Sequence, residues 1–319
     1  MKVIRLFLIP LLLAFFTSFI IISCSPSEEP TTSTTGEPTT TETAETASAT
    51  DSALKVNVFE ASEKGSLVLS SLIEGENEMV LVDSQLVLSE GERLANQIEA
   101  SGKDLKAIWI THAHPDHYFG VEKVLEKFPG TPIYSTPEIV GEIEQRNPRF
   151  VQTLKQNYGD DVTDNPVVPE AYDRDYLDLD RERLEIVKFN QGDTANTTGI
   201  KVPNGTIVAA DVLYWGVHPF LVEAKTEEAR SQWLTTIDNL EAMNPTQVIP
   251  GHKAPEFDLS NSLESINSMR DYLKNFGEIV QTKANADEAF AAVEEAYPDY
   301  KLPGFFLRLS TQAAYPNQS

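Results

Sequence analysis

The segment Thr111–His117 constrains this chain more than any other, because it holds three of the five histidines within six residues. It reads Thr-His-Ala-His-Pro-Asp-His and directly follows Leu105–Ile110, an apolar run that predicts a buried strand. A buried structural histidine is usually solitary and satisfied by one partner. Histidines clustered with an aspartate at a strand end are instead typical of metal ligands. The segment therefore predicts a metal site, and a solvated loop is the alternative interpretation.

The rest of the folded part reads as strands and helices in two batches. We expect strands over 55–60, 66–73, 79–82, 105–110, 133–135, 184–189, 199–202, 206–209 and 247–249. We expect helices over 91–101, 119–128, 226–243, 260–282 and 287–296. Residues 140–179 look less regular, acidic and proline-bearing, with some helix around 150–157. This order predicts a single α/β domain in which two sheets form a sandwich flanked by helices.

The N-terminus has the pattern of a secretory signal over residues 1–23. Lys2 and Arg5 precede a nearly unbroken apolar run, which ends at Ser23-Cys24. The small residue before cysteine resembles the lipobox of bacterial lipoproteins, in which the cysteine begins the mature protein and carries the lipid. The resemblance implies a lipid anchor through Cys24 in a bacterial membrane, on the periplasmic or outer side. An uncleaved signal anchor is the alternative, and both interpretations place the remaining chain outside the cytoplasm.

Residues 24–53 predict a disordered tether, and residues 54–319 predict the folded domain. The tether is dominated by Ser and Thr with Glu, Pro and Ala, so it cannot bury enough apolar surface to offset its ordering entropy. The whole chain has a formal net charge of -24, with 49 acidic against 25 basic side chains. Most of that acidity lies in the predicted domain, which disfavours nucleic acid as a partner.

Three further landmarks follow in chain order. Asp83 comes at the end of an early strand, Asp211 follows a later strand, and His252 stands in a Gly-His pair after another. With these landmarks, the histidine segment resembles the HxHxDH signature of the metallo-β-lactamase superfamily of metal-dependent hydrolases. The resemblance covers most of residues 55–257. It implies a four-layer αββα sandwich and two divalent metal ions, with zinc expected first and iron or manganese as alternatives.

One landmark departs from that pattern, because the family usually has a Gly-His-Thr or Gly-His-Ser turn where this chain has Asp193. A carboxylate is a legitimate zinc ligand, and harder ions prefer it. The implied ligands are His112, His114 and Asp193 for one centre and Asp116, His117 and His252 for the other, with Asp211 between them. Asp193 could instead be a turn residue beside Gly192, in which case the first centre would be weakened or empty.

Five other assignments accompany this site. His218 could hydrogen-bond substrate or donate a proton, or it could be a surface histidine. Tyr214 resembles the tyrosine that lactonases of the superfamily use near the substrate carbonyl, or it could be a packed aromatic ring. Asp116 could ligate a metal or carry a proton during catalysis. We expect Thr111 and Thr194 to orient ligands from outside.

The resemblance implies hydrolysis of a small ester, lactone, thioester or amide by a water that the metal ions convert to hydroxide. A β-lactam substrate is disfavoured by Asp193, and residues 141–180 are predicted to form a lid over the site. Two other functions remain open. The set His112, His114 and Asp193 has the 2-His-1-carboxylate composition of non-haem iron enzymes such as sulfur dioxygenases. A non-catalytic lipoprotein that binds a metal or ligand is the third possibility.

Overall fold

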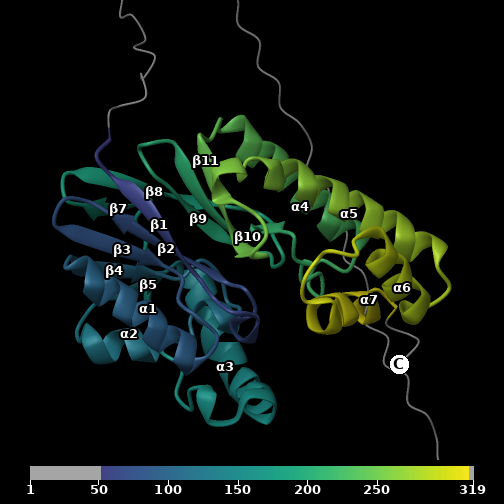
Figure 1. Ribbon diagram of the computed structural model, residues 1–319, viewed down its shortest axis with the longest axis horizontal. Helices are drawn as coiled ribbons and strands as arrows, with labels where there is room; N and C mark the ends of the chain where they lie inside the picture. The colour runs from purple at the N-terminus through teal and green to yellow at the C-terminus, as the bar shows by residue number, and fades with distance from the viewer. Residues whose placement is uncertain (1–51, 316–319) are drawn as a thin grey trace, which may run out of the picture. The chain divides into compact units, whose positions relative to one another are not determined.

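Two sheets form the framework of residues 52–315, the part of the chain that the computed structural model describes (Figure 1). The first sheet has the order β1 (Lys55–Glu60), β2 (Leu69–Glu74), β3 (Glu78–Val82), β4 (Asp104–Trp109), β5 (Ile133–Ser135) and β6 (Glu170–Ala171). The second sheet has the order β11 (Gln247–Lys253), β10 (Thr206–Trp215), β9 (Thr198–Lys201), β8 (Glu182–Lys188) and β7 (Tyr176–Leu179). Neighbouring strands run parallel from β3 to β6 and between β10 and β11, and the other pairs are antiparallel.

Helices cover the outer faces of both sheets (Figure 1). The helices α1 (Leu88–Ser101) and α2 (Val121–Lys127) pack in one apolar cluster with the first sheet, and α4 (Glu227–Ala242) and α5 (Glu264–Thr282) pack in another with the second. A third cluster fills the space between the sheets, where Val80 and Trp109 meet Ile200 and Ile249. The four layers are therefore helix, sheet, sheet and helix, which confirms the predicted αββα sandwich.

The predicted signal 1–23, Cys24 and the predicted tether up to residue 51 lie outside the described residues. Between residues 52 and 315, no helix has both the length and the apolar character that a bilayer span requires. Short 3-10 helices occur at η1 (Glu63–Gly65), η2 (Pro115–His117), η3 (Gly159–Asp161) and η4 (Leu259–Asn261).

The irregular segment predicted after residue 140 is wrong in its first part, because helix α3 runs over Pro137–Tyr158. Its interior contains Pro148, which removes one backbone donor and is normally unfavourable in a helix. The helix persists because Ile139, Ile143 and Leu154 recur at helical spacing and are buried against the first sheet's helices. Further along the predicted lid, residues 176–179 form β7 at the edge of the second sheet.

Strand β10 also differs from the prediction, because it continues six residues beyond 209 and contains Asp211 rather than ending before it. The backbone of Ala210 has a φ of 47°, a left-handed value that is uncommon for a residue with a side chain. The pairing with β11 shifts register on both sides of Ala210. Such irregularities re-aim side chains, and here the irregularity turns the carboxylate of Asp211 toward the histidines.

The C-terminal part contains helix α6 (Ala286–Ala296), a π-helical turn η5 (Pro303–Leu307) and helix α7 (Arg308–Ala314). The sequence predicted α6 but neither η5 nor α7. The ring of Phe306 packs in the core of the second sheet, beside Tyr214. The C-terminal segment therefore lies against the end of β10 that carries Asp211.

Candidate metal centre

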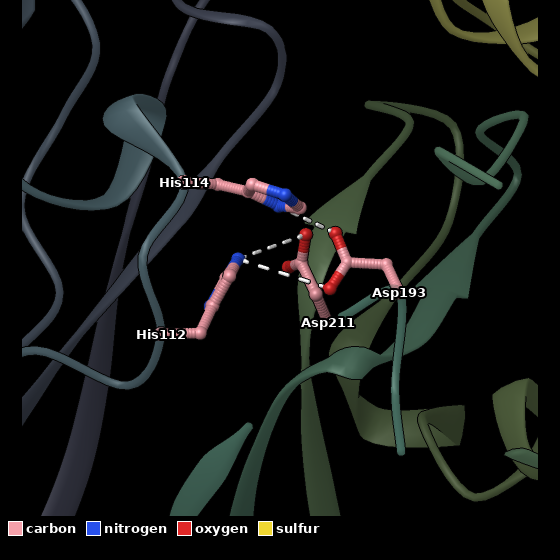
Figure 2. A group of neighbouring side chains, drawn as sticks. All are labelled: His112, His114, Asp193 and Asp211. Atoms are coloured by element: carbon pink, nitrogen blue, oxygen red, sulfur yellow. Dashed lines mark ion pairs between the residues drawn. The ribbon is translucent and has the colours of Figure 1, made fainter. Parts of the chain in front are cut away.

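Seven side chains that the sequence predicted as ligands lie together where the two sheets meet. They follow β4, form part of η2, lie between β8 and β9, and belong to β10 and β11: His112, His114, Asp116, His117, Asp193, Asp211 and His252. Ligand atoms within 4.8 Å of one another define three groups among the described residues, and two of them account for all seven side chains: His112, His114, Asp193 and Asp211 form the first, and Asp116, His117 and His252 form the second. Figure 2 shows the first group, in which two histidines from the loop after β4 face Asp193, from the loop between β8 and β9, and Asp211 of β10.

The first group places imidazole nitrogens against carboxylate oxygens (Figure 2). His114 Nδ1 lies 2.7 Å from Asp193 Oδ2. His112 Nε2 lies 3.9 Å from Asp193 Oδ1 and 3.6 Å from Asp211 Oδ2. All four side chains are buried. Asp193 is therefore buried beside both histidines, where a metal ligand could stand, and it also lies in the bend beside Gly192.

Asp211, a member of the first group, also lies close to the two histidines of the second group. His117 Nε2 lies 3.3 Å from Asp211 Oδ1, and His252 Nε2 lies 3.3 Å from Asp211 Oδ2. Asp116 Oδ2 lies 3.5 Å from His252 Nε2, and the Asp116 side chain is 13% exposed. Asp211 thus stands between both groups, as the sequence predicted.

Two of the histidines are oriented by Asp83 and Thr111. The Thr111 hydroxyl donates to Asp83 Oδ2 at 2.6 Å, and the Thr111 backbone N–H donates to Asp83 Oδ1 at 2.8 Å. The hydroxyl proton is then committed, so Thr111 Oγ1 accepts from His112 Nδ1 at 3.0 Å. His117 Nδ1 donates to Asp83 Oδ2 at 2.8 Å. Both histidines consequently direct Nε2 at the aspartates.

The other two histidines are held in the same manner. His252 Nδ1 donates to the backbone oxygen of Ser66 at 2.7 Å, in a turn where Ser66 has a φ of 61°. His114 Nε2 donates to Glu223 Oε1 at 3.0 Å, which leaves Nδ1 directed at Asp193. Each of the four histidines therefore has one nitrogen fixed from outside and the other directed inward.

The inward atoms suit a divalent metal. His112 Nε2, His117 Nε2 and His252 Nε2 are buried and have no hydrogen-bond partner among the described residues. Asp193 Oδ1 and Asp211 Oδ1 are buried and unpartnered in the same way. Buried polar atoms without partners are costly. Neutral imidazole and carboxylate are the nitrogen and oxygen ligands that zinc takes, so the residues present fit the binding of divalent metal.

The charges of the group depend on their neighbours. Burial opposes ionisation of Asp211, but the facing His117, His252 and His112 hold its pKa well below the ordinary value. Burial, together with the nearby Asp211 charge, raises the pKa of Asp193. Burial also lowers the pKa of His112 well below its ordinary value. Cations at the centre would offset the repulsion between the two carboxylates.

The Gly-His landmark requires glycine at position 251, because Asp211 and the backbone of Ala210 lie very close to it. A Cβ at Gly251 would lie 1.7 Å from Asp211 Oδ1 and 2.9 Å from the backbone carbon of Ala210. Any side chain there would displace the shared aspartate or the backbone that carries it. Gly251 therefore makes room for Asp211, while the next residue supplies the imidazole.

Tyr214 lies inside the cluster. Its hydroxyl donates to Asp193 Oδ2 at 3.1 Å and also to Asp211 Oδ2. Its ring stacks on His252, with centroids 4.8 Å apart and an interplanar angle of 5°. Burial and the two carboxylates raise the pKa of Tyr214 well above its ordinary value, so the hydroxyl remains a donor. Tyr214 is thus both a packed ring and a hydrogen-bond donor to two predicted ligands.

His218 lies in a different environment. It is buried rather than on the surface, and its Nδ1 lies 2.8 Å from the Tyr272 hydroxyl. Its ring also contacts Tyr300, with centroids 5.6 Å apart. It is in neither ligand group. The structure therefore brings Tyr214 into the cluster and leaves His218 outside it.

The sequence analysis missed Glu223 and Arg146. Glu223 accepts from His114 and from the Thr194 hydroxyl at 3.0 Å, and its two oxygens pair with Arg146 at 2.7 and 3.0 Å. Burial opposes its ionisation, but the hydrogen bonds from His114 and Arg146 lower the pKa of Glu223 to about 2. Arg146 belongs to α3, so part of the predicted lid is tied to a predicted ligand. No local motif marks either residue, and only the fold brings them together.

Comparison with known proteins shows a resemblance to one superfamily. Residues 64–202 match the family model of the metallo-beta-lactamase superfamily. A probable metallo-hydrolase of Streptococcus pyogenes is 37% identical over 67 residues, which make up 19% of this chain and 29% of that protein. The match thus spans less than a third of the length of that curated relative.

Two solved structures share the fold. A metallo-beta-lactamase family protein from Thermus thermophilus has a TM-score of 0.58 at 18% identity, covering 82% of this chain and 91% of its own. A beta-lactamase domain protein from Burkholderia ambifaria has a TM-score of 0.57 at 14% identity, covering 82% of this chain and 85% of its own. Residues 64–202 thus resemble the metallo-beta-lactamase superfamily in sequence, and the chain shares its fold with these two structures.

Proposed function

We propose that this protein is a metal-dependent hydrolase that acts on a small ester, lactone, thioester or amide. The observation that carries the proposal is the convergence of unpartnered, buried nitrogen and oxygen atoms around Asp211. The family match over residues 64–202 and the similarity to a probable metallo-hydrolase support hydrolysis as the reaction class.

Divalent ions held there would acidify a water and polarise the scissile carbonyl group. Residues of the chain orient the predicted ligands before any metal binds. Asp83 and Thr111 fix the tautomers of His112 and His117, so their free nitrogens need no rearrangement before they bind. Asp116 is the most exposed carboxylate of the two groups, so it is placed to exchange a proton with solvent.

Two complete ligand groups favour a two-metal hydrolase over a single-iron oxygenase. The iron alternative would use only His112, His114 and Asp193, and it would leave the second group without a task. We expect about two zinc ions per chain after reconstitution, and hydrolysis in a screen of lactone, ester, thioester, β-lactam and phosphodiester substrates. One iron with oxygen consumption would favour the oxygenase, and no bound metal would exclude both enzymes.

The variant Asp193→Ala sharpens this test, because only the first group uses Asp193. We expect it to lose about one of two zinc ions and most of its hydrolysis. Unchanged zinc content would show that Asp193 is not a ligand, and the first centre would then need another account.

We also propose that the protein lies outside the cytoplasm and is held at a bacterial membrane by a lipid on Cys24. Its support is the order of basic, apolar and small residues before the only cysteine in the chain. Expressed with a labelled fatty acid, the natural chain should take up the label and fractionate with membranes. A Cys24→Ser variant that keeps both properties would exclude a lipid anchor at Cys24.

A further inference from the structure

We propose that Phe220, Phe305 and Phe306 form an aromatic wall that binds an apolar acyl chain beside the metal centre. The inference rests on the proposed hydrolysis and names the part of the substrate that gives it specificity. The aromatic wall combines a residue that follows β10 with two residues from the π-helical turn η5.

The aromatic wall touches predicted ligands of both groups. The Phe220 ring meets His114 edge to face, with centroids 5.4 Å apart. The Phe306 ring meets His252 edge to face, with centroids 5.2 Å apart. A carbonyl group that lies between the two groups would therefore have aromatic carbon directly beside it.

Exposure rises along the wall from the metal centre outward. Phe306 is buried at 4% exposure, Phe220 is partly buried, and Phe305 is 45% exposed. The Phe305 ring lies nearly parallel to Phe220, with centroids 6.5 Å apart, and it also contacts Phe306. Phe305 is the most exposed large hydrophobic residue among those described. Ring contacts thus run without a break from the predicted ligands to the exposed ring of Phe305.

The wall is held in place by polar contacts at its base. Ser310 Oγ accepts from the backbone N–H of Leu221 at 2.8 Å and donates to the backbone oxygen of Phe306. The backbone of Lys301 pairs with Gly216 at 2.9 Å and with His218 at 3.0 Å. These contacts bind the C-terminal segment to the loop after β10. A site fixed before binding loses little affinity to ordering.

An acyl chain fits this arrangement better than a charged or strongly polar group. The three rings offer burial and flat faces, and they carry no charge that could pair with an ionic substituent. Glu223, which contacts the same His114 as Phe220, is already paired with Arg146. A chain attached to the carbonyl carbon would leave water as it lies along the wall.

Straight-chain carboxylates test the wall without requiring turnover, because they are the acids that acyl hydrolysis would release. The full-length, zinc-loaded protein is titrated calorimetrically with acetate, butanoate, hexanoate and octanoate. Full burial strengthens binding about fourfold for each methylene. One wall covers only part of the chain, so we expect about twofold for each methylene. Affinities that do not depend on chain length, or no binding at all, would overturn the proposal.

Phe305→Ala should remove most of the chain-length dependence, and Phe305→Leu should restore part of it. Leu263→Ala is the matched control, because Leu263 is 43% exposed, which is close to the exposure of Phe305. Leu263 lies beside Ser262, whose hydroxyl accepts from Val248 near the start of β11, and it is not part of the aromatic wall. The Leu263→Ala variant should keep the wild-type dependence. If Phe305→Ala behaves like Leu263→Ala, the wall does not bind the chain.

Acyl ester hydrolysis by the same samples separates the two proposals. Chain-length-dependent binding without hydrolysis would contradict the proposed function and leave the aromatic wall standing. Hydrolysis that is indifferent to acyl length, with chain-length-independent binding, would support the hydrolase and exclude the wall.

Discussion

The five histidines of this protein are buried in two contrasting environments. Four of them surround Asp211 and Asp193, and the fifth, His218, lies among tyrosines. Within residues 52–315, both environments contain an imidazole nitrogen without a hydrogen-bond partner, namely His218 Nε2 and His252 Nε2. Burial and a free nitrogen are therefore common to both and do not distinguish them.

The two environments differ in whether carboxylates face the free imidazole nitrogen. Among the four, every inward nitrogen faces an aspartate oxygen. His218 has neutral neighbours, and burial alone lowers its pKa to about 4. Converging carboxylates provide the negative charge that a divalent cation needs. The contrast teaches that a metal site here requires donors whose free atoms point at a common space.

The largest loss of metal affinity is expected when the carboxylate charge around the four histidines is removed, so that their environment resembles that of His218. Asp211→Asn keeps the shape of the shared aspartate and removes its charge. Loss of an outer partner typically costs 10 to 100-fold in metal affinity, so loss of a ligand shared by both groups should cost more than about 100-fold. Zinc affinity is measured by competition with a chelator. A variant that retains wild-type affinity would exclude Asp211 as the bridge.

A smaller effect is expected from an outer partner. Glu223→Gln removes the charge that accepts from His114 Nε2 while keeping an oxygen in reach. We expect zinc to bind the first group about tenfold more weakly and the second group unchanged. Arg146→Lys keeps a cation near Glu223 but loses the bidentate geometry. It should have a weaker effect than Glu223→Gln, and the reverse order would show that Arg146 acts independently of the acid.

The smallest effect concerns His218 and acts on stability. Its unfolded pKa is near 6.5 and its folded pKa is about 4, so acid favours the unfolded chain between these values. The wild type should lose about 2 kcal/mol from this histidine between pH 7 and pH 5. Its neighbours Tyr272 and Tyr300 stay neutral there, because burial raises the pKa of each hydroxyl.

Urea unfolding of the wild type and His218→Gln at the two pH values measures this contribution. The variant should lose less stability than the wild type on acidification, and it should keep its zinc. Equal pH dependence would show that folding does not lower the pKa of His218. A loss of zinc in the variant would indicate that His218 contributes to the metal centre.

Much of the site could be predicted from sequence because its ligands stand beside the ends of strands. His112 and His114 directly follow an apolar run. Gly251 marks the position of His252 in the sequence, because only glycine leaves room there for Asp211. Asp193 was predictable only through its place in the order of landmarks. The αββα layers followed from apolar runs whose period marks strands and helices.

The remaining features depend on contacts between distant segments. Glu223 and Arg146 are 77 residues apart, and nothing local marks either one as a partner of His114. The full length of α3 was hidden by Pro148, whose local cost is outweighed by the buried stripe on the same helix. The aromatic wall joins Phe220 to the C-terminal turn, so it becomes visible only once the chain has folded.

Zinc stoichiometry tests the central claim most directly. The full-length protein, stripped with a chelator and dialysed against excess zinc, should retain about two ions per chain, and His218→Gln should retain the same number. Asp211→Asn should retain fewer than one after the same treatment. A wild-type protein that retains no zinc, or an Asp211→Asn variant that retains two ions, would contradict a metal centre built around Asp211.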